Sequence, residues 1–284
     1  MKSSLNTLLL GGCMVHWPIT RTDCARGRLD CDAFGGTQEV HTFGEIFQIV
    51  DLLQGRGEVP QDLRKLAHMR PQLRPVPAAE RFENLDLVLL GPSSPIELRF
   101  RGVWLNRTAI QRHVLAPLAS QSEEMERLAG RWVRQGLVGL NKRVRDEAGA
   151  KLLENIRGGS AEAELARALI REIEVSRSDI AGGFRRARER FDCPIGVILY
   201  IFRYMPDGRA ISWPAGFRED VLDSARALDL PVFDPTPHVL RHGVDAAMMP
   251  GHSHYKPAFL PVMGAAIVDF AESLCARSRL EPVA

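Results

Sequence analysis

The sequence predicts an α/β protein built as a three-layer sandwich, with helices on both faces of a central parallel sheet. Short apolar runs of strand length alternate with helical patterns along most of the chain, as in repeated β-α-β units. Several runs are apolar at nearly every position, which is typical of strands that are buried on both faces. These runs end at Gly or Pro. With 284 residues, 45% of them hydrophobic and 25% charged, the chain can bury a core of ordinary size.

The expected strands follow from these runs in chain order. Residues 7–10 form the first strand, which ends in the turn Gly11-Gly12. Residues 85–90 form the clearest interior strand, because the run stops at Gly91-Pro92 and proline cannot continue a strand ladder. The other expected strands, which are shorter or less regular, are 39–43, 96–104, 193–202 and 230–233. Of these, 96–104 suits a sheet edge or a hairpin.

Helices are expected between these strands. Residues 14–36 suggest a partly helical start followed by a surface loop. Helical patterns also occur at 45–53, 61–69, 214–228 and 261–275. Residues 108–190 are rich in Ala, Glu, Leu and Arg and are interrupted by glycines near 136–139 and 158–159. We therefore predict a single α/β domain over residues 1–284, with three or four helices forming an insertion or cap at about 108–190.

Composition argues against several classes of protein. The formal net charge is only +2, which gives no general reason to expect a nucleic-acid partner. The N-terminal apolar run is too short for a signal peptide, and no apolar run of about 18 residues predicts a membrane span. Five cysteines without a regular framework suit free thiols in a reducing compartment. We expect a cytoplasmic protein without a membrane partner, and the sequence leaves its oligomeric state open.

Candidate functional residues follow the predicted strands, because ligands of open parallel sheets bind beyond the carboxyl ends of the strands. Cys13 follows the first strand, and its thiol is a potential nucleophile whose pKa a helix N-terminus lowers. A small buried cysteine is the alternative reading of Cys13. Further small or polar residues follow the expected strands: His16, Gly44, Ser93, Ser94 and Asp234.

Two histidines lie in a loop just before the last expected helix. His254 is a candidate general base for Cys13, and His252 competes with it for this role. Both are also compatible with a surface loop or with a zinc site completed by Cys13 or His16. The arginines within residues 171–190 are interleaved with acidic residues, which favours a solvated helix face over a phosphate site.

Four short blocks, taken in order, resemble the SGNH/GDSL hydrolase-like superfamily with its flavodoxin-like sheet. They are Leu-Gly-Gly-Cys at 10–13, Thr-Phe-Gly-Glu-Ile at 42–46, Leu-Gly-Pro-Ser-Ser-Pro at 90–95 and His-Tyr-Lys-Pro at 254–257. The resemblance is strongest to the Gly-Ser-Cys branch, which has a cysteine nucleophile and includes proteins similar to capsular-polysaccharide acyltransferases that bind coenzyme A. It implies that Cys13 is the nucleophile, that Gly44 and the Cys13 N–H are oxyanion donors, and that His254 is the base.

The chain departs from this family at three positions. Ser93 stands where the family has an oxyanion asparagine, and Gly12 stands where the branch has serine. Gly251 occupies the place of the aspartate that precedes the family's histidine, which leaves Asp234 or Asp245 as possible replacements.

We therefore expect an acyltransferase, thioesterase or esterase that acts on a small-molecule or carrier-bound acyl substrate. It requires no resident cofactor, and coenzyme A or a carrier-protein thioester is the candidate acyl donor. Two alternatives remain: a non-catalytic binding protein with the same fold, and a metal-dependent enzyme that uses His252 and His254.

Overall fold

A computed structural model describes residues 4–23, 25, 27–31, 38–67, 84–200, 203–204, 210–211, 216–250 and 254–278. Contacts divide the chain into two compact units. The first comprises residues 1–57, 72–95 and 179–284, and the second comprises residues 58–71 and 96–178.

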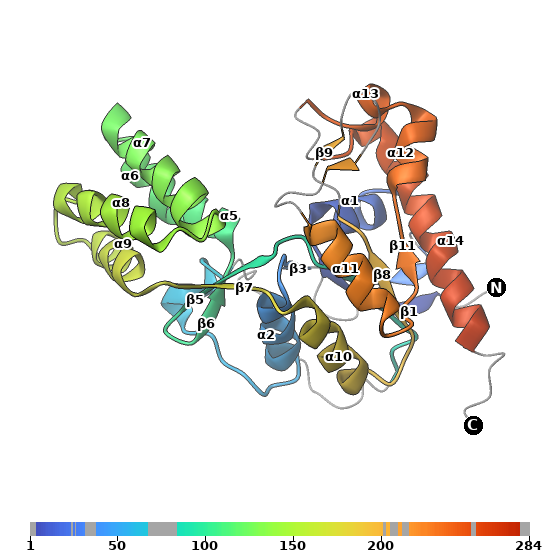
Figure 1. Cartoon of the computed structure of the whole chain (residues 1–284). Helices are drawn as coiled ribbons and strands as arrows, with labels where there is room; N and C mark the ends of the chain where they lie inside the picture. Colours follow the sequence, from blue (N-terminus) through green and yellow to red (C-terminus); the bar gives the residue numbers. More distant parts are fainter. Residues whose placement is uncertain are drawn as a thin grey trace. The chain divides into compact units, whose positions relative to one another are not determined.

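A parallel sheet forms the centre of the first unit (Figure 1). Its strands are β1 (Leu5–Gly11), β2 (Leu29–Asp30), β3 (Gln38–Glu39), β4 (Leu87–Gly91), β8 (Ile195–Ile198) and β11 (Val232–Phe233). Their order is β11-β8-β4-β1-β2, and β3 pairs with the carboxyl end of β1. This is the 2-1-3-4-5 order of flavodoxin-like sheets when β2 and β3 count as one position. The predicted fold class is confirmed.

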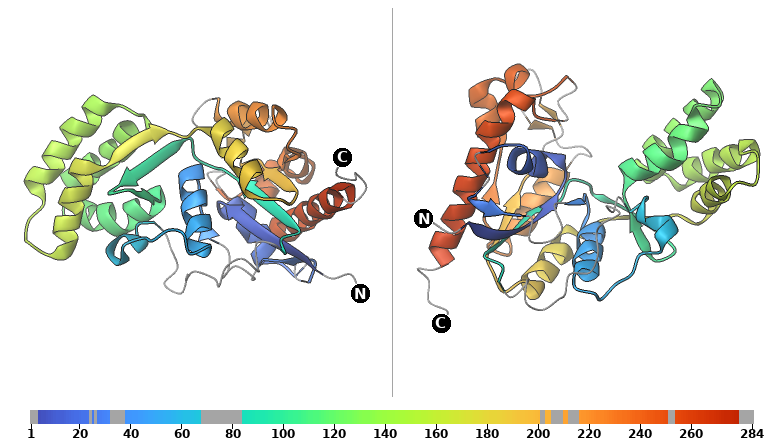
Figure 2. Two further views of the ribbon diagram at one scale, coloured as in Figure 1. Left: turned by 90° about the horizontal axis from the view of Figure 1, so that it is seen from below. Right: turned by 180° about the vertical axis from the view of Figure 1, so that it is seen from behind.

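Helices cover both faces of this sheet (Figures 1 and 2). On one face, α1 (Cys13–Thr20) packs against α14 (Leu260–Ser278). On the other lie α2 (Phe43–Leu53), α10 (Ile180–Arg190) and α11 (Phe217–Arg226). The rings of Phe43 and Phe184 join α2 to α10 edge to face, with their centres 5.0 Å apart. The unit also contains four short elements that the sequence analysis did not predict: α12 (Thr236–His242), α13 (Val244–Ala247), β9 (Arg203–Tyr204) and β10 (Ala210–Ile211).

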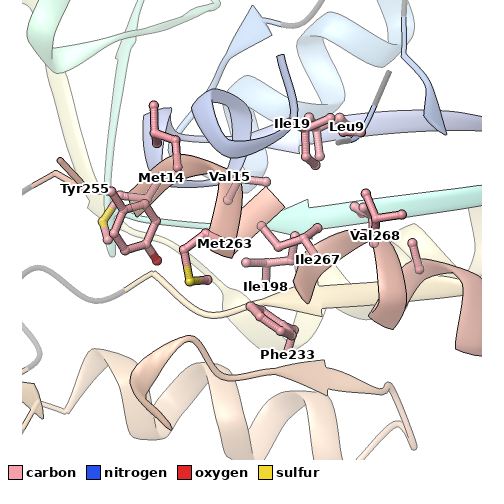
Figure 3. Packing of buried hydrophobic residues seen from close by; sticks show 14 of the residues in the cluster. Leu9, Met14, Val15, Ile19, Ile198, Phe233, Tyr255, Met263, Ile267 and Val268 are labelled. Carbon is pink, nitrogen blue, oxygen red and sulfur yellow. The ribbon is translucent and has the colours of Figure 1, made fainter. Parts of the chain in front are cut away.

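The core between α1, α14 and the sheet is apolar (Figure 3). Leu9 and Ile198 come from the sheet, Val15 from α1, and Met263 and Ile267 from α14, and all five are buried. The segment Pro257–Ser278, formed by η4 (Pro257–Phe259) and α14, is long and apolar enough to span a membrane by length and composition. A core helix meets the same criteria, and half of this window is buried inside the fold.

The second unit contains a small antiparallel sheet of β5 (Ile96–Phe100), β6 (Val103–Leu105) and β7 (Glu174–Arg177). The alternation of residues 96–104 thus corresponds to a hairpin, whereas β7 lies in a stretch predicted to be helical. The helices of this unit are α3 (Gln61–Arg64), α5 (Arg107–Ile110), η2 (Gln111–Leu115), α6 (Ala116–Ala119), α7 (Glu123–Arg131), η3 (Trp132–Val138), α8 (Lys142–Asn155) and α9 (Ala161–Glu172). The expected insertion at about 108–190 overlaps this unit, which ends at Ser178, while α10 belongs to the first unit.

Candidate functional site

The two central strands of the parallel sheet end in glycines that allow α1 to approach closely. Gly11 of β1 is paired with Gly91 of β4. A Cβ atom on Gly91 would lie 2.4 Å from Cγ2 of Val15, and one on Gly11 would lie 3.0 Å from the same atom. Only glycine therefore fits beside Val15 at Gly91. The close approach brings the start of α1 to the point between β1 and β4 where flavodoxin-like sheets bind ligands.

Cys13 is the first residue of α1 and is buried, with 6% of its surface exposed. Its Sγ lies 3.4 Å from the Oη of Tyr200, which follows β8. Burial, the largest effect, raises the pKa of the Cys13 thiol, and the charge of Glu39 also raises it. The hydrogen bond with Tyr200 and the backbone amides of Met14 and Cys13 lower this pKa. The shift is opposite to the one expected from the helix terminus alone, because burial outweighs the favourable donors. Cys13 therefore rests as a neutral thiol at neutral pH.

Tyr200, which forms this hydrogen bond with the sulfur, is itself buried. Burial raises the pKa of the Tyr200 phenol well above its usual value. The phenol is therefore neutral at physiological pH and can donate its O–H hydrogen to a Cys13 thiolate. Such a bond to a charged sulfur stabilises the thiolate relative to the thiol.

Gly12 lies among the side chains of Tyr200, His41 and Ser93, which come from distant segments of the chain. A Cβ atom on Gly12 would lie 3.1 Å from a ring carbon of Tyr200 and 3.2 Å from both His41 Nδ1 and Ser93 Oγ. His41 Nδ1 and Ser93 Oγ are hydrogen-bonded to each other at 2.6 Å. The backbone N–H groups of Ser93 and Ser94 both donate to the carbonyl of His41. A side chain at position 12 would need these neighbours to shift by a few tenths of an ångström.

The segment after β3 turns into α2 beside this cluster. Thr42 caps α2, since its Oγ1 accepts a hydrogen bond from the Glu45 N–H at 3.3 Å. The Glu45 carboxylate accepts from the N–H of His41, the residue before the N-cap, at 3.3 Å. Gly44 is the second residue of the helix and is buried. The N-terminal turn of α2 is thus fixed next to His41.

His254 lies in the loop before α14 and contacts α1 through Trp17. The two rings are stacked, with centres 5.0 Å apart and an interplanar angle of 22°. Trp17 Nε1 donates a hydrogen bond to Glu39 Oε1 at 3.1 Å. Burial lowers the pKa of His254, and the charge of Glu39 acts in the opposite direction. His254 is therefore a neutral imidazole at neutral pH, in the form that can accept a proton.

The other predicted residues lie at several places. His16 is buried within α1. The carboxylate of Asp234 accepts hydrogen bonds from Arg218 at 2.7 Å and from the Thr236 N–H at 2.9 Å. Asp245 is exposed on α13, and His252 lies outside the described residues. Among the residues that the structure describes, no group of three His, Cys, Asp or Glu side chains could hold a metal ion.

Four residues around Cys13 and His254 were not selected by the sequence analysis: Trp17, Glu39, His41 and Tyr200. Trp17 lies one helical turn after Cys13, so a helix that begins at Cys13 places both on one face. Glu39 and His41 lie in the strand predicted at 39–43, which is wrong beyond Glu39 because β3 ends there and α2 begins at Phe43. Tyr200 lies in the predicted strand 193–202, but an interior aromatic residue is not distinctive there.

Comparison with known proteins places the chain in one family. The family described as the TviD N-terminal domain matches residues 5–270, which is nearly the whole chain. The match supports a relationship to proteins similar to capsular-polysaccharide acyltransferases. No curated protein and no solved structure matches the chain.

Proposed function

The chain belongs to the TviD N-terminal domain family, and we propose that it is an acyl-transfer enzyme with Cys13 as its nucleophile. The observation that carries this proposal is the position of the thiol. Cys13 begins a helix at the carboxyl end of the sheet, and its sulfur is hydrogen-bonded to Tyr200. An SGNH-like arrangement of Cys13, Gly44, Ser93 and His254 is part of the proposal.

In the proposed first step, the Sγ of Cys13 attacks the acyl carbonyl carbon of a thioester donor. The thiol proton passes to neutral His254, and the donor's C–S bond breaks to give an acylated Cys13. The departing thiolate takes the proton from His254. An alcohol, amine or water then attacks the acyl-cysteine, transfers its proton through His254 to Cys13, and releases the free thiol.

The surrounding groups support charge development in these steps. Tyr200 donates to the sulfur as it becomes a thiolate, which offsets part of the effect of burial on the Cys13 pKa. The backbone N–H groups of Cys13 and Gly44 and the hydroxyl of Ser93 are the proposed donors to the acyl oxygen. Ser93 is already held by His41, so its hydroxyl is oriented before substrate binds. Coenzyme A or a carrier-protein thioester is the proposed acyl donor.

Intact-mass analysis after incubation with acetyl-coenzyme A and longer acyl-coenzyme A thioesters tests this proposal. We expect the wild-type protein to gain the mass of one acyl group, and we expect Cys13→Ala to gain none. Cys193→Ala is the matched control, because Cys193 is a second free cysteine in the same unit. It should be acylated like the wild type. An unmodified wild-type protein, or equal labelling of Cys13→Ala, would contradict the proposal.

A binding protein that retains the fold without the chemistry is the second candidate function. The burial of Cys13 and its raised pKa favour this candidate, because most buried cysteines are unreactive. It predicts that acyl thioesters bind without modifying the wild-type protein. The mass experiment therefore separates the two candidates.

A further inference from the structure

Trp17 connects His254 to a carboxylate that lies far from it in sequence. Its indole ring stacks on the imidazole of His254, and its Nε1–H donates to Glu39 at 3.1 Å. Glu39 is half-buried at the end of β3, which pairs with the carboxyl end of β1 next to Cys13. One continuous set of contacts thus links β3, α1 and the loop that carries His254.

From these contacts we infer that Glu39 is a positioning residue for His254: it fixes the imidazole through Trp17 and stabilises the imidazolium formed when Cys13 is deprotonated. This inference rests on the proposed function of Cys13 and His254. Glu39 would supply the negative charge that an aspartate supplies in a Ser-His-Asp triad, with an indole ring in place of a direct hydrogen bond.

The electrostatic effects of Glu39 agree in sign with this role. Its charge raises the pKa of His254, so it favours the protonated imidazole. It also raises the pKa of Cys13, so it favours the resting thiol. A carboxylate with both effects keeps Cys13 protonated until substrate is attacked, and it then stabilises the proton on His254.

The other titratable or charged groups around this cluster come from several elements. Cys13 begins α1 and Arg21 is the residue that follows it. Tyr200 follows β8, and Tyr255 and Lys256 come directly after His254. The Arg21 guanidinium lies 4.0 Å from the centre of the Trp17 ring. Of these groups, it is the charge of Glu39 that shifts the pKa of His254, and it acts against burial.

The acidic residues selected from the sequence have other contacts. Asp234 binds Arg218 and the start of α12, and Asp245 is exposed on α13. Glu39 is the acid whose charge acts on both Cys13 and His254 in the described part of the chain.

The decisive variant is Glu39→Gln, because an amide oxygen still accepts the Trp17 hydrogen bond while the charge is lost. NMR titration of the imidazole, assigned with His254→Asn, should show His254 titrating at lower pH than in the wild type. The rate of Cys13 acylation should fall by about tenfold, and the acidic limb of its pH profile should move to lower pH. This loss is much smaller than the roughly 10⁴-fold effect known for a buried triad aspartate, because Glu39 is partly exposed.

Trp17→Phe provides an independent second variant. Phenylalanine retains a ring that can stack on His254 but has no N–H to hold Glu39. We expect a smaller shift of the His254 titration in the same direction. If Glu39 acts through Trp17, the double variant should titrate like Glu39→Gln alone, so the two effects are not additive.

Glu272→Gln is the matched control, since Glu272 is an acidic residue of α14 that pairs with Arg28 at 2.6 Å. It should leave the His254 titration unchanged. An identical His254 titration in the wild type and Glu39→Gln would overturn the inference, as would an equal shift in Glu272→Gln. The titration requires no turnover. Failure of the wild type to form an acyl-enzyme would therefore overturn the proposed function but would leave the coupling between Glu39 and His254 measurable.

Discussion

The central sheet carries a cysteine at each end, and the two sulfurs have different surroundings. Cys13 follows β1 at the carboxyl end, where its neighbours are Tyr200, two backbone amides and Glu39. Cys193 precedes β8 at the amino end, near Cys275, Asp192 and Asp86. Burial raises the pKa of both thiols, and that of Cys193 reaches about 12.

The difference lies in what offsets burial. At Cys13 a neutral phenol and two backbone amides favour the thiolate. At Cys193 its own backbone amide favours the thiolate, while Cys275, Asp192 and Asp86 oppose it. Burial of a cysteine in the same fold therefore does not decide its reactivity. We propose that the hydrogen-bond donors at the carboxyl end of the sheet make Cys13 the more reactive of the two thiols.

The largest expected effect is the low reactivity of Cys193. With a pKa of about 12, Cys193 should react with iodoacetamide near pH 8 roughly a thousandfold more slowly than a cysteine in the unfolded chain. Peptide mass spectrometry of the native and the denatured protein measures both rates. Cys13 should be alkylated faster than Cys193 in the native protein. Equal native rates would show that the donors around Cys13 have no effect on its sulfur.

The second effect concerns the close packing at the carboxyl end. Gly91→Ala would place a Cβ atom 2.4 Å from Cγ2 of Val15, so we expect a loss of about 1–3 kcal/mol in the free energy of unfolding. Val15→Ala in the same chain should recover part of the loss by removing the clashing methyl groups. Urea denaturation gives these values.

Gly159→Ala is the control for this substitution, because nothing lies within 4 Å of a Cβ atom at that position. Its stability should be unchanged or slightly higher, since alanine restricts the unfolded chain. If Gly91→Ala were equally harmless, the start of α1 would not depend on the paired glycines.

The third effect isolates the phenol that distinguishes the two cysteines. Tyr200→Phe removes the partner of Cys13 at 3.4 Å, and this hydrogen bond lowers the pKa of the thiol. The pKa of Cys13 should therefore rise, and its alkylation near neutral pH should slow by about tenfold, as expected for a bond to a charged group. The rate at Cys193 should not change. An unaltered Cys13 rate would mean that the phenol does not stabilise the thiolate.

Local patterns were sufficient to predict most of the sheet. The apolar runs at β1 and β4 end in glycines, and both strands were found close to the predicted limits. The strands β2 and β3 contain two residues each, which is too short for any periodicity to be recognised. The strand β7 (Glu174–Arg177) is mostly polar and exposed, so its sequence resembles the neighbouring helices.

The site was less accessible to sequence reasoning, because its contacts join distant segments. Cys13 could be selected from its place after the first strand. Its partner Tyr200 is 187 positions away, and Ser93 is 52 positions from His41. Such pairs depend on strand order and on the depth to which each side chain is buried. The raised pKa of Cys13 has the same origin, since burial cannot be read from its immediate neighbours.

The smallest expected effect is a pH dependence of stability at the carboxyl end. Burial places the pKa of His254 in the folded protein below its usual value of 6.5, so the unfolded chain binds more protons as the pH falls. The stabilisation from the neutral imidazole is complete above about pH 6.5 and is lost as the pH falls through the folded pKa. The loss should be below about 1 kcal/mol, because the ring is only half-buried and solvent screens its charge.

Urea denaturation near pH 7.5 and pH 5.5 measures this loss. His254→Asn should reduce the difference in stability between the two conditions, and Glu39→Gln should increase it, because the Glu39 charge opposes the shift. His238 at the start of α12 is a necessary comparison, since burial and Arg241 also lower its pKa. His238→Asn should reduce the pH dependence by a separate and additive amount. If Glu39→Gln weakened the pH dependence instead, the charge of Glu39 would not favour the His254 imidazolium in the folded protein.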